Sequence, residues 1–331
     1  MQPADSDRIS RPSPLKGEGN MNSTQWKAFD WKILMICAVL ASVVVGFVGG
    51  YFVGGAQQKI QVSLVDDYGR TVELNGIPQR IVSAAPTPTE ILFAVGAGGQ
   101  VVGVDDYSDY PVAVKNLTKI GSYTLNLEVI ISLHPDLVVC SDLVPKSQLD
   151  LIQAQGIPYF IFATRTMDDV YKDLNLAGVL TGHSTEAQTL VAGLKARVDA
   201  VTEKTLDPLV EKQRTYIEYY PLWTYGPGSF GDDIIRLAGG TNIAANASNE
   251  YPQLTPEFVI EKDPQVIVYT IGPMTTTNAA EIEARSGWGH ISAVSNGKIY
   301  SIDDNLLSRY GPRIVDGLEQ LAKILHPDLF S

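Results

Sequence analysis

The sequence predicts an α/β protein of two Rossmann-like lobes, joined by a single long helix around a ligand cleft and preceded by a transmembrane anchor. The main observation is a segment that occurs twice, at residues 128–139 and 257–268. In both copies a Glu opens a short helical stretch, a Pro follows seven residues later, and a β-branched run indicates a buried strand. Two short amphipathic helices upstream, at residues 89–97 and 232–240, form a second matching pair. A duplicated αβ unit predicts two lobes with equivalent surface points.

The composition limits the function classes. The chain has 331 residues, of which 45% are hydrophobic, enough for one large or two medium globular units. The net charge is −12, and Lys and Arg are scattered, which argues against a nucleic-acid-binding surface. Only one cysteine, Cys140, lies beyond the apolar N-terminal region. An intramolecular disulfide is therefore excluded there, and Cys140 is expected to be a small core residue.

An uncharged apolar stretch at residues 33–56 predicts a membrane anchor, because it exceeds the roughly 20 residues that a spanning helix needs. Lys and Arg precede the stretch, so the positive-inside rule predicts a cytoplasmic tail at residues 1–32 and a binding domain outside the cell membrane. A cleaved signal peptide is the alternative, although its apolar region is usually only about 7 to 15 residues long. Cys37 is not expected to carry a lipid, because Ile36 precedes it where a small residue is needed and Lys32 is too near.

The exported part begins with a first α/β lobe, expected at residues 57–165. Residues 62–74 alternate apolar and polar around Asp67-Tyr68-Gly69, which predicts a hairpin. Helical segments then separate four strand-like runs. The alternation predicts a mostly parallel sheet with helices on its faces. The four runs are residues 80–84, 101–104, 137–140 and 159–163.

A helical linker is expected at residues 166–212, and a second lobe at 213–331. Residues 166–169 form a helix-capping pattern, and apolar residues continue at helical spacing to about Thr205, with a turn at residues 181–184. The strand and helix patterns then resume. They fall at residues 215–220, 233–238, 266–270, 299–302 and 312–325.

An ordered series of motifs resembles one known family. Among them are Asp66-Asp-Tyr-Gly-Arg-Thr-Val, Tyr107-Ser-Asp-Tyr-Pro111, Leu237-Ala-Gly-Gly and Arg309-Tyr-Gly-Pro-Arg313. The chain resembles, from about Ile60 to Leu325, the substrate-binding proteins of ABC importers for cobalamin, haem and ferric siderophores. It is most similar to the cobalamin-binding branch. The resemblance implies two lobes joined by a rigid helix and a partner permease dimer with its ATPase.

The resemblance also gives the repeated glutamates a role. In the family, the matching residues dock onto arginines of the two permease subunits, which here implies Glu128 and Glu257. A two-fold symmetric permease presents the same basic pocket twice, and a pseudo-symmetric protein meets it with one carboxylate per lobe. The alternative is a surface glutamate favoured by the helix dipole, since Thr255 and Pro256 place Glu257 in a first helical turn.

Aromatic side chains are the candidate ligand contacts. In open α/β sheets ligands bind at the carboxyl ends of the strands, and a large flat ligand needs stiff aromatic faces with polar tips. The resemblance implies contacts for Tyr107, Tyr123 and Tyr251, although the cobalamin branch favours Trp at the last two. The aromatic residues on the predicted loops are Tyr107, Tyr110, Tyr123, Trp223, Tyr225 and Tyr251.

Two arginines complete the candidate site. By the resemblance, Arg309 and Arg313 lie near the cleft, where they pair with ligand carboxylates or phosphate, or else form structural salt bridges. No other basic cluster appears in the sequence. This favours a mostly amide-decorated corrinoid over a strongly anionic ferric siderophore, with haem also open.

Two other classes remain as competitors. An extracytoplasmic enzyme is disfavoured, because no G-x-S-x-G, H-E-x-x-H or phosphate-binding glycine loop is present. A metal-ion binding protein would need three or four convergent ligands. The four histidines, His134, His183, His290 and His326, are isolated in sequence. The sequence therefore predicts a binding protein with no catalytic residue, no metal site and no cofactor.

Overall fold

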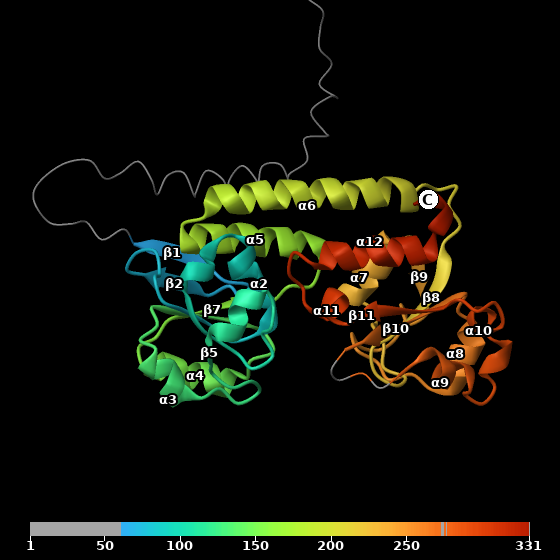
Figure 1. Cartoon of the computed structure of the whole chain (residues 1–331), viewed down its shortest axis with the longest axis horizontal. Helices are drawn as coiled ribbons and strands as arrows, with labels where there is room; N and C mark the ends of the chain where they lie inside the picture. The colour runs from blue at the N-terminus through green and yellow to red at the C-terminus, as the bar shows by residue number, and fades with distance from the viewer. Residues whose placement is uncertain (1–60, 273–274, 276, 331) are drawn as a thin grey trace, which may run out of the picture. The chain divides into compact units, whose positions relative to one another are not determined.

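The computed structural model describes residues 61–272, 275 and 277–330, and residues Lys59–Ser331 form one compact unit (Figure 1). The predicted tail at residues 1–32 and the predicted anchor at residues 33–56 lie outside the described residues. Among the residues that are described, no helix is long and apolar enough to cross a membrane.

The N-terminal lobe is built on a parallel sheet, as the alternating patterns predict. Its strands pair in the order β5-β4-β3-β6-β7, and every pairing is parallel. An antiparallel hairpin precedes the sheet, and Gly69 turns it with a left-handed φ of 74°, which confirms the predicted hairpin. The strands are β1 (Val62–Val65), β2 (Thr71–Leu74), β3 (Ile81–Ser83), β4 (Val101–Val104), β5 (Thr118–Lys119), β6 (Leu137–Ser141) and β7 (Tyr159–Phe162).

The C-terminal lobe has a second parallel sheet, in the order β11-β10-β8-β9. Two edge strands, β5 with two residues and β9 with three, were not predicted, because such short runs show no periodicity. The strands of this lobe are β8 (Gln213–Glu218), β9 (Gly240–Asn242), β10 (Val266–Ile271) and β11 (Ile299–Asp303).

Helices cover both faces of each sheet. In the N-terminal lobe, Ile81 and Phe160 face the core shared with α2 and α5, whereas Val82 and Ile161 face the core shared with α3 and α4. The C-terminal sheet lies between α7 and α12 on one face and α8 on the other. These helices are α2 (Pro86–Ala94), α3 (Leu127–Ser132), α4 (Lys146–Ala154), α5 (Met167–Thr181), α7 (Phe230–Leu237), α8 (Pro256–Lys262) and α12 (Ile314–Leu325). Short helices α9 (Ala279–Glu283), α10 (Ser292–Ser295) and α11 (Asn305–Ser308) complete the lobe.

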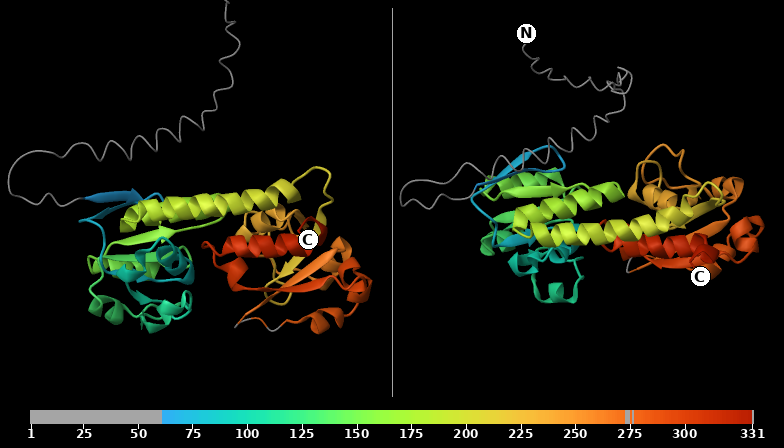
Figure 2. Two further views of the ribbon diagram at one scale, coloured as in Figure 1. Left: turned by 45° about the horizontal axis from the view of Figure 1, so that its top comes forward. Right: turned by 90° about the horizontal axis from the view of Figure 1, so that it is seen from above.

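The two lobes are connected by α5 followed by α6 (Ser184–Thr205), and α6 runs along both lobes (Figures 1 and 2). Thr166 and Asp169 form the predicted capping box of α5, and Gly182 ends that helix with a φ of 80°. On α6, Arg197 binds Asp316 of α12 at 2.5 Å and Glu319 at 2.8 Å. A single core cluster includes residues of α2, α5, α6, α7 and α12. The lobes therefore share one continuous apolar core along α6.

Candidate functional site

The duplicated αβ unit is reproduced position by position in the structure. Asn126 caps α3 by accepting the Val129 N–H at 3.1 Å, and Thr255 caps α8 by accepting the Phe258 N–H at 3.2 Å. Each helix ends at a left-handed residue other than glycine, which leads through a proline into a parallel strand. These residues are His134, with a φ of 47°, and Asp263, with a φ of 43°.

An arginine stabilises each of these strained turns, a feature that sequence reasoning missed. The Nε of Arg80 donates to the Leu133 carbonyl at 2.9 Å, and the Nε of Arg214 donates to the Asp263 carbonyl at 2.9 Å. Arg80 immediately precedes the central strand β3, and Arg214 is the second residue of the central strand β8. An arginine thus binds a carbonyl at the end of each helix, although the two carbonyls differ by one position within the repeat.

Glu128 and Glu257 are both exposed, each in the first turn of its helix. Neither carboxylate has a hydrogen bond or ion pair to any other described residue, so both are available to a partner. Figure 1 shows α3 and α8 on the side of the molecule away from α6, one in each lobe.

The predicted aromatic residues lie on loops at the carboxyl ends of the parallel strands. Tyr107 follows β4 and Tyr123 follows β5, whereas Trp223 follows β8 and Tyr251 lies after β9. In the N-terminal lobe, the Tyr107 and Tyr123 rings meet edge to face at 5.8 Å, with 47% and 70% of the two residues exposed. They form an open aromatic corner whose faces are free to contact a ligand.

The loop that carries Tyr107 is held by buried polar groups. Asp105 accepts the Tyr107 N–H at 3.0 Å and a hydrogen bond from the Ser108 hydroxyl. Lys119 donates to the Ser108 carbonyl at 2.6 Å, while Thr89 shares a hydrogen bond of 2.8 Å with the Ser108 hydroxyl. Burial raises the pKa of Asp105, partly offset by its bond from Ser108. The loop is therefore rigid before any ligand arrives.

Tyr225 corrects one expectation. Only 3% of this residue is exposed, so it lies beneath the loop surface and offers no free face to a ligand. Its ring packs at 5.1 Å from Tyr219 and at 6.4 Å from Tyr251. A Cβ at Gly231 would come within 2.1 Å of the Tyr225 ring, which explains the glycine there. Tyr225 therefore supports Tyr251 from below.

Tyr310 is an aromatic residue that sequence reasoning missed as part of this group. Its ring stacks on Phe230 at 4.6 Å, and its hydroxyl lies 3.3 Å from that of Tyr251. Its position between the two candidate arginines was the available signal. Trp223 is half-buried, and its backbone bridges those of Tyr220 and Gln253.

Arg309 and Arg313 connect the lobes through protein carboxylates. Arg313 binds Glu90 of α2 through two hydrogen bonds, at 2.9 and 2.5 Å. The Nη1 of Arg309 lies 2.5 Å from Asp109 and 3.3 Å from Glu90, and its Nη2 donates to the Tyr107 carbonyl at 3.2 Å. The structure thus contains the structural salt bridges that the sequence left open. We call Glu90, Asp109, Arg309 and Arg313 the interlobe clasp.

Three of the four clasp side chains are largely shielded from water, whereas that of Asp109 is 56% exposed. The Glu90 side chain is 1% exposed, and those of Arg309 and Arg313 are 12% and 18% exposed. Partial burial alone would raise the pKa of Asp109, but its hydrogen bond from Arg309 and the positive charges of both arginines lower that pKa. The guanidinium of Arg309 is therefore occupied, and a ligand carboxylate could pair with it only by displacing Asp109.

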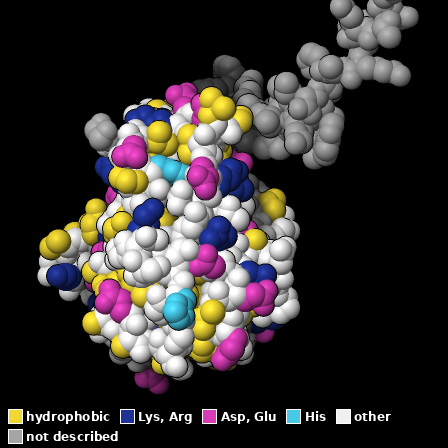
Figure 3. Space-filling model, turned by 90° about the vertical axis from the view of Figure 1, so that its right-hand side faces the viewer, with side chains coloured by type: hydrophobic (Ala, Val, Ile, Leu, Met, Phe, Trp, Pro, Cys, Tyr) yellow, Lys and Arg dark blue, Asp and Glu magenta, His cyan; other side chains and the backbone are white. Residues whose placement is uncertain are grey.

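The histidine, cysteine and charged side chains of the described residues are placed as follows. Within the described residues, no three His, Cys, Asp or Glu side chains group closely enough to hold a metal ion. His326 instead lies 3.1 Å from the Gly239 carbonyl, and Cys140 is buried in the N-terminal lobe. On the end of the C-terminal lobe, acidic and basic side chains are mixed (Figure 3), so this face has no basic stripe for nucleic acid.

Comparison with known proteins gives the family. The periplasmic binding protein family model matches residues 81–306. The chain belongs to the periplasmic binding protein family. An uncharacterized ABC transporter substrate-binding lipoprotein of Bacillus subtilis is 31% identical over 287 residues, covering 83% of this chain and 90% of that protein. The expected resemblance is confirmed, and the relatives in this family are solute-binding proteins, not enzymes.

The chain is also similar to two proteins that are named for their ligands. A cobalamin-binding protein of Halobacterium salinarum is 28% identical over 269 residues, covering 79% of this chain and 73% of that protein. The solved structure of a periplasmic heme-binding protein from Roseiflexus is 29% identical, with a TM-score of 0.68, and covers 76% of this chain and 98% of that one. The two-lobed α/β architecture described above is thus the architecture of the family.

Proposed function

We propose that the chain captures a corrinoid, such as cobalamin, outside the cytoplasmic membrane and delivers it to the permease of an ABC importer. The observation that carries the proposal is the set of aromatic side chains on the carboxyl-end loops of both sheets. Tyr107 and Tyr123 stand on one lobe, and Tyr251 and Trp223 on the other. The interlobe clasp joins the Tyr107 loop to the segment between α11 and α12, whose Tyr310 lies against Tyr251, and this supports a ligand site between the lobes.

A corrinoid fits the charges of these loops better than a strongly anionic ligand does. Both clasp arginines are already paired with carboxylates of the protein, so they leave no free cation for an anionic ligand. A corrin ring carrying neutral amides instead needs stiff apolar faces and hydroxyl tips, which tyrosine provides at low entropic cost. The cobalamin-binding relative supports the same ligand class.

Haem or a ferric siderophore is the second candidate. The 29% identical heme-binding structure favours haem. An exposed tyrosine such as Tyr123 supplies a phenol oxygen, and tyrosine is one of the side chains that ligate haem iron in proteins. A haem would also bring two carboxylates, which could compete with Asp109 for Arg309. The two candidate ligands therefore differ in whether Arg309 keeps Asp109 as its partner when the ligand binds.

Delivery to the permease is proposed to use Glu128 and Glu257. Their exposure, their lack of partners among the described residues and their matching first-turn positions support this role. The carboxylate of each glutamate would accept hydrogen bonds from one arginine of a two-fold symmetric permease. A charge-assisted contact of this kind contributes about 1.5 to 3 kcal/mol.

The protein is proposed to stay in the cell membrane through residues 33–56, with its N-terminus in the cytoplasm and the binding domain outside. The Bacillus subtilis relative is named a lipoprotein, so the mode of attachment needs its own test. Intact-mass spectrometry of the membrane-extracted protein should give an uncleaved chain. A mass that corresponds to cleavage before Cys37 with an attached lipid would contradict the helical anchor.

The ligand class can be tested by absorption spectroscopy. Residues 59–331 are incubated with cobalamin, haem or a ferric siderophore, freed of unbound ligand by gel filtration, and scanned in the visible range. We expect the corrin spectrum to be retained with the protein. Retention of haem or ferric siderophore in place of the corrin would move the protein to the second candidate, and retention of none would contradict the proposal.

A further inference from the structure

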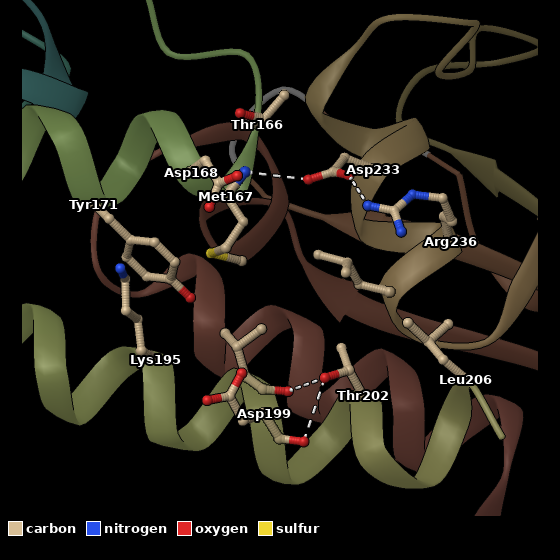
Figure 4. Close-up of a pocket in the computed structure, with 12 residues that line it drawn as sticks. Thr166, Met167, Asp168, Tyr171, Lys195, Asp199, Thr202, Leu206, Asp233 and Arg236 are labelled. Atoms are coloured by element: carbon tan, nitrogen blue, oxygen red, sulfur yellow. Dashed lines mark hydrogen bonds and ion pairs between the residues drawn. The ribbon is translucent and has the colours of Figure 1, made fainter. Parts of the chain in front are cut away.

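A pocket of about 530 Å³ lies between α5, α6 and α7, and none of the predicted aromatic ligand contacts lines it (Figure 4). Its volume falls within the range of about 300 to 1,000 Å³ that small-molecule sites occupy. The pocket is therefore separate from the proposed corrinoid site and needs its own account.

The pocket has an apolar floor and a charged rim. Met167, Val198 and Leu237 are buried residues that supply the floor, one from each of the three helices. An apolar floor beneath a charged rim suits a ligand that has both an apolar body and a polar head. The rim residues are Asp168, Asp199, Asp233, Lys195 and Arg236.

The charges on the rim do not balance. Asp233 binds Arg236 at 2.5 Å and also accepts the Met167 N–H at 3.1 Å, so this pair is satisfied. Among the described residues, the side chains of Asp168 and Asp199 have no hydrogen bond or ion pair. Lys195 is the remaining cation, and its ammonium lies over the Tyr171 ring, 5.1 Å from the centroid. The pocket thus keeps an excess of negative charge.

Tyr171 provides a second, independent sign of a missing ligand. This residue is only 7% exposed, and its hydroxyl is buried without any hydrogen-bond partner. Figure 4 shows the ring of Tyr171 extending from α5 toward α6, with the hydroxyl directed into the space beside Asp199. Burial, followed by the charges of Asp168, Asp199 and Asp233, raises the pKa of Tyr171 to about 12. The hydroxyl is therefore neutral, and buried hydroxyls are normally hydrogen-bonded.

We propose that this pocket is a second binding site, which takes a small organic cation with an apolar body, such as an arylalkylammonium ion. The apolar body packs on Met167, Val198 and Leu237. The ammonium group donates a hydrogen bond to the Tyr171 hydroxyl oxygen and lies beside Asp168 and Asp199, where its single positive charge offsets the net negative charge of the rim. Because α5 packs against α2 of the N-terminal lobe and α7 belongs to the C-terminal lobe, the occupant contacts α7 together with both connecting helices, α5 and α6.

Calorimetric titration of the full chain in detergent tests the site, with phenethylammonium as the probe and 2-phenylethanol as its neutral analogue. We expect saturable binding of the ammonium and at least about tenfold weaker binding of the alcohol. The double variant Asp168→Asn/Asp199→Asn and the variant Tyr171→Phe should each weaken the binding of phenethylammonium by about tenfold. Glu186→Gln, an equal loss of charge per site elsewhere on α6, should leave binding unchanged.

Three results would overturn the proposal: no saturable binding of phenethylammonium, equal binding of the alcohol, or full affinity in the double asparagine variant. The last variant changes two exposed residues, so loss of fold does not confuse its outcome. Tyr107→Ala provides a check on location. Unchanged ammonium affinity in that variant places the site away from the aromatic loops, whereas its loss would place the probe there and contradict this pocket.

Discussion

At the scale of single residues, Glu90 is the most consequential side chain of the interlobe clasp. It is 1% exposed and binds both Arg313 and Arg309 from the other lobe. Glu90→Ala leaves the largely buried Arg313 without its carboxylate partner, while Arg309 keeps Asp109, so the substitution should lower the free energy of unfolding by about 3 to 5 kcal/mol. Chemical denaturation measures this change. Glu261→Ala removes a glutamate that is 73% exposed, and it should change stability by less than about 0.5 kcal/mol. Equal effects of the two substitutions would show that the clasp contributes no stability.

Asp173 gives a pH-dependent prediction. This carboxyl is fully buried and accepts a hydrogen bond of 2.6 Å from Thr164. Burial, together with the negative charge of Asp67, raises the pKa of Asp173 from 3.8 to about 8. Between pH 3.8 and about 8, Asp173 is therefore protonated in the folded protein and ionised in the unfolded chain. The contribution of Asp173 to stability falls as the pH rises through this window, because unfolding then releases a proton.

Asp173→Asn removes that dependence. Relative to the wild type, the variant should gain stability as the pH rises from about 5 to about 8, because only the wild type loses its proton on unfolding in that range. Urea unfolding at both pH values measures the difference. If the free energy of unfolding changed by the same amount between the two pH values in the wild type and in Asp173→Asn, the raised pKa of Asp173 would be refuted.

The aromatic side chains on the loops of both lobes are predicted to determine ligand affinity. Tyr107→Ala and Tyr251→Ala should each weaken corrinoid binding by about 1 to 3 kcal/mol, the scale for losing an aromatic anchor. Tyr300→Ala provides the control, because Tyr300 is a partly exposed tyrosine on β11 and not on these loops. Equilibrium titration should find its affinity unchanged. Equal losses in all three variants would point to general destabilisation instead of ligand contact.

At the scale of secondary-structure elements, α3 and α8 are a duplicated pair with a testable role. Changing both Glu128 and Glu257 to Ala should leave corrinoid affinity intact and abolish stimulation of the transporter ATPase, because the two exposed carboxylates are proposed to bind the permease and not the ligand. Glu186→Ala/Glu203→Ala, an equal loss of charge on α6, is the matched control and should stimulate normally. Raised salt should weaken the docking of the wild type more than that of the Glu128/Glu257 variant. Normal stimulation of the ATPase by the Glu128/Glu257 variant would mean that the two glutamates have no role in docking and that the repeat reflects only the duplicated fold.

The same elements show how far the sequence predicts the structure. The repeat was visible because each copy places a helix, a proline and a strand within a short window, where local periodicity carries the signal. The pairs Arg80–Leu133 and Arg309–Asp109 join residues far apart in the chain, and no local pattern encodes them. Tyr225 was expected to contact the ligand because its loop was recognised, but its burial depends on packing against Gly231 and Tyr251. The sequence predicts that aromatic residues lie on these loops. It does not predict which of their rings are exposed and which, like that of Tyr225, are buried.

At the scale of the whole molecule, one core cluster extends through α2, α5, α6, α7 and α12, and the polar contacts of the clasp also join the two lobes. Two separate connections between the lobes restrict hinge motion, since both must yield for the lobes to part. The ligand site is therefore expected to be largely preformed, which lowers the entropic cost of binding a large rigid ligand.

Equilibrium dialysis of cobalamin against residues 59–331 tests the central claim most directly. The proposed function predicts one bound cobalamin per chain with a Kd of about 1 µM or tighter. It also predicts that the affinity falls in Tyr107→Ala and Tyr251→Ala and stays unchanged in Tyr300→Ala. No cobalamin binding by a folded protein, with haem or a ferric siderophore bound tightly in its place, would contradict the corrinoid assignment.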